Sequence, residues 1–199
     1  MTWSGSLTTA GTGIRRPPQA DDSELLTRVA HGDLEAFEHL YRVYRLRLTR
    51  FLAALLKRPE LIEEVLDDTM MVVWQTAGSF RGSSKVSTWI FAIAYRKAYK
   101  AKARWPDPVE DPEQDDRMST DPGPDEELGK QQLRAALMKA MDGLSVDHRA
   151  VVDLTYFHDM GYREVAEIVG CPIDTVKTRM FHARRRLKQA MSGSLVDWI

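Results

Sequence analysis

Cysteine is almost absent from this sequence, and so are long apolar segments. The single cysteine, Cys171, excludes an intramolecular disulfide framework and fits a reducing, cytoplasmic environment. No apolar run approaches the ~20 residues that a membrane-spanning helix needs. The first 20 residues contain no apolar core of the kind found in a secretory signal, so we expect a flexible N-terminal tail at 1–20.

The motifs of common enzymes are missing as well. The five histidines are scattered, and the sequence contains no His-Glu-x-x-His, no glycine-rich phosphate loop and no nucleophile elbow. A lone histidine lies far more often on a surface or in a core than at a metal. We therefore predict no catalytic residue, no metal site, no cofactor and no small-molecule substrate, and a metalloenzyme or hydrolase is a weak alternative.

Charge is abundant and unevenly distributed. Residues 1–105 carry 16 basic and 11 acidic side chains, residues 106–128 carry one and ten, and residues 129–199 carry 11 and eight. The middle segment also contains five prolines, so we expect an extended acidic linker at 106–128. The basic block on each side of it could bind a polyanion such as nucleic acid.

Apolar residues on both sides of the linker recur at helical spacing, and no stretch alternates convincingly with period two. We predict helices at about 21–31, 33–56, 59–76, 88–104, 129–142, 145–158, 162–169 and 173–191. Asp21 to Ser23 and Ser145 are the expected N-caps of two of them, and Pro59 opens another.

The predicted fold is therefore all-α. It consists of two compact helical domains, at 21–105 and 129–192, joined by the acidic, proline-rich linker and followed by a short tail at 193–199.

The segment from Gly161 to Leu187 has the layout of a DNA-reading helix pair. Gly170 suits a left-handed C-cap and Pro172 cannot continue the first helix, so a tight turn is expected between the two helices. Between 173 and 190 there are six Lys or Arg and one Asp, a balance that suits a helix lying in a major groove. The apolar stripe opposite these charges consists of Val176, Met180, Ala183 and Leu187. A basic surface helix of an ordinary enzyme is the alternative.

The helix predicted at 59–76 carries charge of the other sign. Its acidic side has no basic residue for intrahelical pairing, and like charges four residues apart destabilise a helix slightly. Two large apolar residues, Met71 and Trp74, lie on the same side, which indicates a docking face for a basic partner helix rather than a merely solvated surface. The acids are Glu60, Glu63, Glu64, Asp67 and Asp68.

The next helix, at 88–104, carries a cationic stripe formed by Arg96, Lys97, Lys100 and Arg104. The loop before it, from Phe80 to Ser87, combines hydroxyl groups, a glycine and cations. Such a loop could hold an extruded base or a strand of phosphates, although a solvated connector is the default interpretation.

Three segments in this order resemble the extracytoplasmic-function (ECF) sigma factors of bacteria, small two-domain members of the sigma-70-like family. FRGSSKVSTWIFAIAYRKA resembles the family's promoter-melting segment, and IEEVLDDTMMVVW is similar to its polymerase-docking segment. YREVAEIVGCPIDTVKTRMFHARRRL resembles its second DNA-binding region. The resemblance covers about 21–191.

The resemblance implies a role for each set of residues. Docking on the clamp helices of core RNA polymerase falls to Glu64, Asp67, Asp68, Met71 and Trp74. Binding of the minus-thirty-five promoter element as duplex falls to Thr175, Lys177, Thr178, Arg179, His182 and Arg185.

The minus-ten element would be bound by two groups. A flipped base would be held by Phe80, Arg81, Ser83, Ser84 and Lys85, and the phosphates of the separated strand by Arg96, Lys97, Lys100 and Arg104.

The sequence departs from the family pattern in three places. Asp67-Asp68 replaces a Gln-Glu or Gln-Asp pair, which keeps the acidity of the docking helix. Ser83 stands where an acid is common, leaving the loop more cationic, and Phe181 takes an often polar place on the reading helix. Base preference is therefore not transferred from the family.

By resemblance, the partners are core RNA polymerase, through its clamp helices and its flap, promoter DNA, and an anti-sigma factor of the soluble or membrane-anchored kind. The implied function is recognition and melting of promoters for a stress- or signal-responsive set of genes, without catalysis by this chain. The alternative is a helix-turn-helix regulator that binds operator DNA without being a polymerase subunit.

Overall fold

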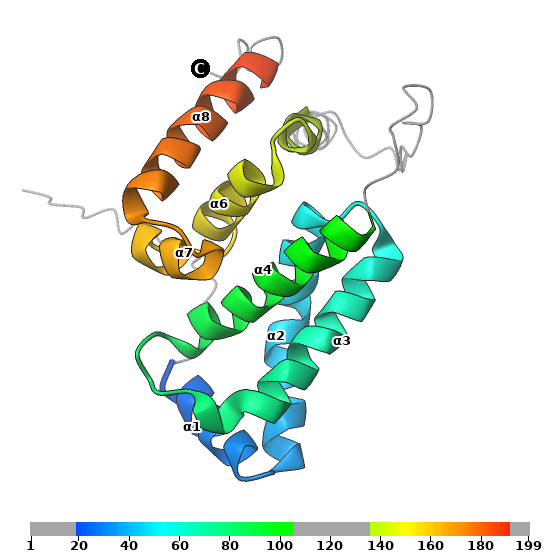
Figure 1. Cartoon of the computed structure of the whole chain (residues 1–199), viewed down its shortest axis with the longest axis vertical. Helices are drawn as coiled ribbons and strands as arrows, with labels where there is room; N and C mark the ends of the chain where they lie inside the picture. The colour runs from blue at the N-terminus through cyan, green and yellow to red at the C-terminus, as the bar shows by residue number, and fades with distance from the viewer. Residues whose placement is uncertain (1–18, 106–135, 192–199) are drawn as a thin grey trace, which may run out of the picture.

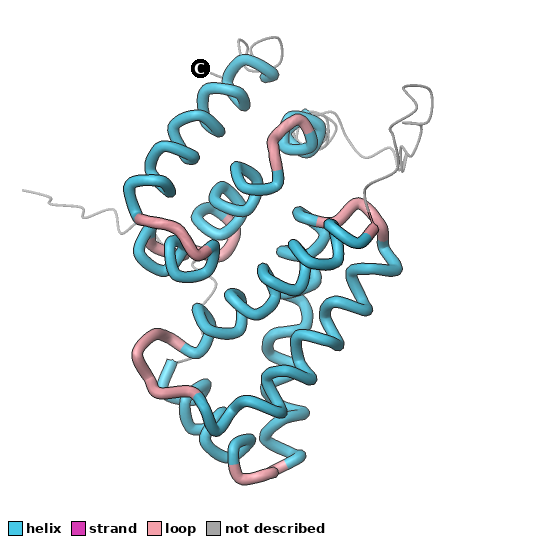
Figure 2. Tube along the Cα trace, viewed as in Figure 1, coloured by secondary structure: helices cyan, strands magenta, loops and turns pink. Residues whose placement is uncertain are grey.

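A computed structural model describes residues 19–105 and 136–191, and every regular element in these two ranges is helical (Figure 1; Figure 2). The predicted linker at 106–128, the tail at 193–199 and nearly all of the tail at 1–20 lie outside the described residues. The elements are α1 (Gln19–Ala30), α2 (Leu34–Leu55), α3 (Pro59–Thr76), the 3-10 turn η1 (Ala77–Ser79), α4 (Val86–Arg104), helical residues 136–142, α6 (Val146–Tyr156), α7 (Tyr162–Val169) and α8 (Ile173–Met191). The all-α prediction is confirmed for this part of the chain.

Local signals in the sequence set several helix ends where they were expected. Pro59 occupies the first turn of α3, where its missing N–H leaves no helical hydrogen bond unmade. The Ser145 hydroxyl accepts a hydrogen bond from the His148 N–H (3.4 Å) and caps α6. The left-handed backbone of Gly170 (φ 66°) ends α7, as the turn between the paired helices requires.

Two helix starts and one helix end differ from the prediction. Helix α1 begins at Gln19, before the residues expected to cap it, and Asp22 instead accepts a hydrogen bond from the Tyr44 hydroxyl (2.5 Å). Helix α4 begins at Val86, two residues early, because the Val86 side chain is buried in the core. Helix α6 ends at Tyr156 rather than 158, and the positive φ of Asp159 (57°) turns the chain back.

Helices α1 to α4 form the first unit around α2, whose buried side has the spacing that the sequence predicted. Five of the large apolar residues that recur along α2 at spacings of three and four are buried, and Phe37 and Tyr41 lie half-buried at its rim. The buried five are Leu40, Tyr44, Leu48, Phe51 and Leu52. Thr69 is also fully buried, and its hydroxyl donates to the Val65 carbonyl (2.6 Å).

Helices α6, α7 and α8 form the second unit, in which α8 packs on α6 and α7. Val176, Met180 and Ala183 are buried, and Leu187 is half-buried, so the predicted apolar stripe of α8 faces inward. This packing fixes the rotation of α8 about its axis and decides which of its side chains reach solvent.

The two units are packed against each other, a contact that no local pattern in the sequence indicates. Helix α7 lies against α4 (Figure 1), and α6 lies against α2. The hydrophobic cluster is continuous across this junction. His158 lies just after the end of α6, and its ring packs edge-on against two rings of the first unit. The ring centroids are 6.0 Å apart for Phe51 and 4.8 Å apart for Phe91. The helices form two groups, α1 to α4 and α6 to α8, as the predicted fold class has it. Within the described residues, however, the two groups share one core.

The core of α2 allows a matched test of this packing. Leu48 is fully buried, whereas Leu46 on the same helix is 62% exposed. We expect Leu48→Ala to lower the free energy of unfolding by about 2–5 kcal/mol, because it leaves a cavity. Leu46→Ala should change it by less than about 0.5 kcal/mol. Urea denaturation of both variants measures the difference, and equal effects would contradict the burial described here.

Candidate nucleic-acid interface

The exposed side of α8 is cationic because its apolar stripe packs inward. Lys177, Thr178, His182 and Arg185 are exposed, as predicted, and Thr175 is half-buried. The Lys177 ammonium lies 2.9 Å from the Asp174 carboxylate, an exposed pair that holds the lysine only weakly. The Thr178 hydroxyl donates to the Asp174 carbonyl (2.9 Å). A helix with this surface fits a DNA major groove.

Arg179 differs from the other predicted reading residues. Its guanidinium lies 2.6 Å from the Asp147 carboxylate at the start of α6, and 3.8 Å from the Cys171 sulfur. Its side chain is therefore half-buried and turned toward the protein rather than toward the exposed side of α8. The structure brings the other predicted residues of α8 to one surface and keeps Arg179 at its edge.

The structure adds an aromatic and cationic group that the sequence did not single out. The Arg184 guanidinium donates to the Tyr156 hydroxyl (2.9 Å) and lies 5.7 Å from the centre of that ring. Three aromatic side chains of the same unit, Tyr156, Phe157 and Phe181, are each more than half exposed. The run Arg184 to Arg186 was a visible signal, but the Tyr156 contact joins residues 28 positions apart and required the fold.

The two histidines of this unit lie near each other. The His148 and His182 rings are 6.4 Å apart, and the Ser145 hydroxyl lies 2.6 Å from Nδ1 of His148. Burial lowers the pKa of His148, and the neighbouring Arg186 lowers it further. His148 is therefore neutral at pH 7 and adds no charge beside the reading helix.

The loop before α4 is shaped by a glycine and anchored by an aromatic pair. Gly82 has positive φ (69°) and reverses the chain, while the half-buried Phe80 ring packs 5.4 Å from Trp89. Arg81 and Ser83 are exposed, and Ser84 is half-buried. Lys85 is different, because its ammonium lies 2.8 Å from the Glu164 carboxylate of α7.

The cationic stripe of α4 lies on the surface, as predicted. Arg96, Lys100 and Arg104 are exposed, and among the described residues neither Arg96 nor Lys100 has an acidic partner. Lys97 is half-buried and lies 2.8 Å from Asp68 of α3. A residue predicted to bind DNA is thus paired with one predicted to bind polymerase. The three exposed cations, Arg96, Lys100 and Arg104, lie four residues apart and repel one another, so an anionic ligand would be favourable there.

The acidic side of α3 is exposed and includes an apolar patch. Met71 is 54% exposed, and Glu64 lies on the same open side. Trp74 is half-buried and packs edge-on against Phe37, with ring centroids 5.1 Å apart. The Asp67 carboxylate accepts a hydrogen bond from the Tyr41 hydroxyl (3.0 Å). The acids therefore flank a partly open apolar strip.

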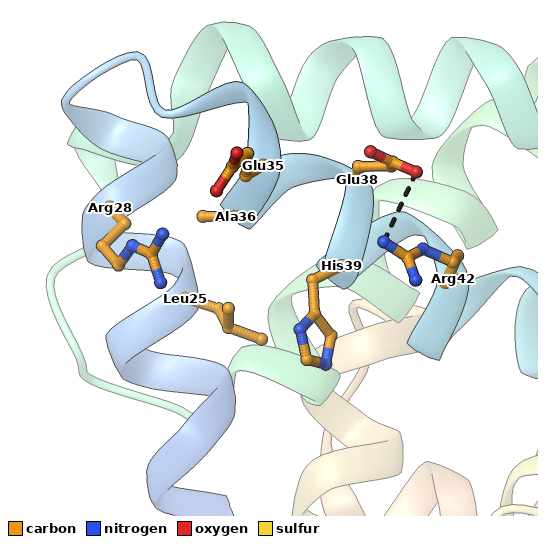
Figure 3. A pocket seen from close by; sticks show the side chains of 7 residues that line it. All are labelled: Leu25, Arg28, Glu35, Ala36, Glu38, His39 and Arg42. Carbon is orange, nitrogen blue, oxygen red and sulfur yellow. Dashed lines mark ion pairs between the residues drawn. The ribbon is translucent and has the colours of Figure 1, made fainter.

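A pocket of about 360 Å³ lies between α1 and α2, away from these surfaces (Figure 3). The Arg42 guanidinium in its lining lies 3.4 Å from the Glu38 carboxylate. Two arginines and two glutamates line it, so it has no excess charge that would favour a polyanion. The lining residues are Leu25, Arg28, Glu35, Ala36, Glu38, His39 and Arg42.

Two other kinds of site are absent from the described residues. No cluster of three or more His, Cys, Asp or Glu in that part of the chain is arranged to hold a metal ion. None of its helices has the length and hydropathy to cross a membrane.

The buried pair Asp153 and His158 (3.1 Å) lies at the junction of the two units, and burial raises the pKa of Asp153.

Two family models match this chain. One describes sigma-70 region 2 and matches residues 40–105, and the other describes sigma-70 region 4 and matches residues 134–187. Together they cover α6, most of α8, the α4 stripe and the acidic side of α3.

Several named proteins are similar over most of the chain. The ECF RNA polymerase sigma factor RpoE of Cereibacter sphaeroides is 34% identical over 167 residues, which cover 81% of this chain and 90% of that protein. The ECF RNA polymerase sigma-E factor of Haemophilus influenzae is 29% identical over 181 residues, covering 85% and 95%.

Solved structures share the fold. CnrH in complex with the cytosolic domain of CnrY matches with a TM-score of 0.63 at 20% identity, covering 87% of this chain and 98% of that one. RpoE in complex with the anti-sigma factor NepR from Bartonella quintana matches with a TM-score of 0.60 at 24% identity, covering 80% and 98%.

The cationic side of α8 makes a direct prediction about DNA. Arg185→Ala should weaken binding of the full chain to duplex DNA and reduce the slope of log affinity against log salt by about one, because one phosphate contact is lost. Fluorescence anisotropy at several salt concentrations measures this slope. Arg42→Ala, on the outer side of α2, is the control and should leave the slope unchanged. An unchanged slope in Arg185→Ala would remove that residue from the interface.

Proposed function

This chain belongs to the ECF family of RNA polymerase sigma factors, and we propose that it binds core polymerase, recognises the minus-thirty-five and minus-ten promoter elements and promotes melting of the DNA. Sigma factors direct transcription initiation and are not themselves enzymes. The proposed genes are a stress- or signal-responsive set, and the proposed place of action is the cytoplasm, where bacterial promoters are transcribed.

The observation that carries this proposal is the separation of charge on the surface. One exposed acidic strip lies on α3, and separate cationic surfaces lie on α4 and α8. A regulator that only binds operator DNA has no need of the acidic strip or of a second cationic surface. A sigma factor needs all three, because it contacts a protein, a single strand and a duplex at once.

Docking on polymerase falls to the acidic strip of α3. The exposed Met71 supplies apolar contact area at its centre, and Trp74 extends that area toward α2. Acids on either side would attract a basic helix, of which the polymerase clamp is the proposed source. These residues are Glu64, Asp67, Asp68, Met71 and Trp74. The second unit would contact the polymerase flap.

Duplex recognition falls to α8. Its exposed side would enter the major groove of the minus-thirty-five element, where Lys177 and Arg185 reach phosphates and Thr175, Thr178 and His182 lie near base edges. The exposed Phe181, 64% accessible, suits contact with a thymine methyl group. Arg179 would join them once its contact with Asp147 is broken.

Capture of the minus-ten element falls to the loop before α4 and to the α4 stripe. Arg81, Ser83 and Ser84, in the same loop as Phe80, offer donors for an unstacked base, with Lys85 next in the chain. Arg96, Lys97, Lys100 and Arg104 follow along α4 and would hold the phosphates of the separated strand. An unstacked base costs energy, and these contacts would offset it.

An anti-sigma factor is the proposed regulatory partner, either soluble or anchored in a membrane. The Bartonella quintana structure that shares this fold is a complex with an anti-sigma factor. The exposed aromatic residues of the second unit and the acidic strip of the first are surfaces that such a partner could cover.

Binding to core polymerase tests the proposal most simply. The full chain should co-migrate with core RNA polymerase in gel filtration, and the complex should give run-off transcripts from genomic fragments that core polymerase alone does not transcribe. Failure to form a complex at micromolar concentration would favour the operator-binding regulator instead.

Charge reversal on α3 tests the docking surface. We expect Asp67→Lys with Asp68→Lys to weaken polymerase binding at least about tenfold, because two attractive contacts become repulsive. Binding of the same variant to duplex DNA should be no weaker than that of the native chain, since α8 is unchanged. Glu24→Lys, an exposed acid on α1, is the control. Normal polymerase binding by the double variant, with helicity unchanged by circular dichroism, would contradict the assignment.

A further inference from the structure

Two arginines of α8 have partners that differ in charge. The Arg179 guanidinium pairs with the Asp147 carboxylate (2.6 Å), which compensates its positive charge. The Arg184 Nε–H donates instead to the hydroxyl of Tyr156, the last residue of α6 (2.9 Å), and Cζ of Arg184 lies 5.7 Å from the centre of the same ring. A phenol is uncharged near neutral pH, so this contact orders Arg184 without compensating its charge.

The contact with Tyr156 leaves most of the Arg184 guanidinium available to another group. The Tyr156 hydroxyl takes only the N–H on Nε, so the donors on both terminal nitrogens remain. Arg184 is exposed to solvent. Terminal N–H groups side by side on a planar guanidinium match the oxygens of a phosphate. Arg184 is therefore ordered, charged and open to an anionic ligand.

Arg184 lies along one edge of the exposed side of α8. The inward packing of the apolar stripe fixes this rotation of the helix. When the reading side enters a major groove, an edge of the helix faces the phosphates of one strand. Exposed residues at spacings of four, three and four follow one another along the edge that carries Arg184, and they are Lys177, Phe181, Arg184 and Lys188.

Tyr156 is placed for this contact rather than for packing in the core. It is 56% exposed, whereas the residues that anchor α6 in the core, Val151, Val152 and Leu154, are buried. Substitutions at exposed positions usually change the free energy of unfolding little. The side chain of Tyr156 can therefore be altered while the fold is kept, and an effect on Arg184 can be measured by itself.

We propose that Tyr156 is a positioning residue for DNA binding, which holds Arg184 as an ordered, uncompensated cation for a phosphate of the minus-thirty-five duplex. This inference rests on the proposed function, since it adds two residues to the surface of α8 that would bind that duplex. A long side chain that is ordered before DNA arrives loses less entropy on binding. The face of the Tyr156 ring attracts the guanidinium as well.

Three substitutions of Tyr156 separate the effect of charge from that of packing. Tyr156→Glu places a carboxylate beside Arg184, and Tyr156→Gln is the matched uncharged control. Tyr156→Phe keeps the ring and removes only the hydroxyl. Each is made in the native full chain and again together with Arg184→Ala. Binding to a DNA duplex of mixed sequence is followed by fluorescence anisotropy at several salt concentrations, and circular dichroism checks that helicity is unchanged.

We expect Tyr156→Glu to bind the duplex about three- to tenfold more weakly than Tyr156→Gln. It should also reduce the slope of log affinity against log salt by about one, as Arg184→Ala does, because one phosphate contact is lost. Tyr156→Phe should weaken binding about two- to threefold with the slope unchanged, since Arg184 still reaches the phosphate but is less ordered. In the Arg184→Ala chain, each substitution should change the affinity by less than about twofold.

Equal affinities and slopes for the Glu and Gln variants would overturn the inference, because Arg184 would then hold no phosphate. An effect of Tyr156→Glu that persists with Arg184→Ala would overturn it too, since general repulsion of DNA explains it. A Tyr156→Phe variant that binds as tightly as the native chain would remove the positioning role, and a native chain that does not bind the duplex would do the same.

Run-off transcription by the native chain with core polymerase is measured in parallel. Its failure would reject the sigma-factor function. Normal run-off with an unaltered salt slope in Arg184→Ala would reject only the role of Tyr156 and Arg184.

Discussion

The seating of the second unit on α4 and α2 is the contact on which the rest of this structure depends. His158 packs between Phe51 and Phe91, and the Arg149 guanidinium reaches the Ala54 carbonyl. These contacts bury aromatic surface and pair polar groups that would otherwise be unsatisfied, so they hold the two units in one relative position. That position decides which charged side chains meet solvent and which meet each other.

The cations of α4 and α8 are exposed because the apolar sides of the same helices pack into the core. On α8 the burial of Val176, Met180 and Ala183 turns the basic side outward. On α4, burial of Phe91 and Ala94 leaves Arg96 and Lys100 at the surface. Helix amphipathicity therefore does two tasks at once, since it builds the core and sorts the charges into separate surfaces. The proposed function uses those surfaces.

Much of this could be predicted from the sequence where the signals are local. The starts of α3, α6 and α8 coincide with Pro59, Ser145 and Pro172. A proline or a capping hydroxyl acts within one turn of its own position, so these signals can be read locally. The exposure of Lys177 and Arg185 follows from the helical spacing of the apolar stripe on the opposite side of α8. That stripe consists of Val176, Met180, Ala183 and Leu187. A period in the sequence is enough to assign a helix and its outward side.

The rest depended on contacts between residues far apart in the chain. Nothing near Lys85 indicates that Glu164 will lie beside it, and nothing near Lys97 indicates Asp68. Asp21 to Ser23 have the residue types of an N-cap, yet α1 begins before them and Asp22 bonds Tyr44 of α2 instead. His158 was one of five scattered histidines, and only the fold brings it between two aromatic rings. Burial and pairing across the junction are tertiary properties that a single-sequence pattern does not contain.

The most direct measurement of the central claim is permanganate reactivity of promoter thymines in the presence of core RNA polymerase and this chain. The account predicts reactive, unpaired thymines around the minus-ten element only when both proteins are present, with reactivity reduced in the Arg96→Ala, Lys100→Ala variant. A stable complex of polymerase, chain and promoter in which the duplex stays unreactive would contradict it.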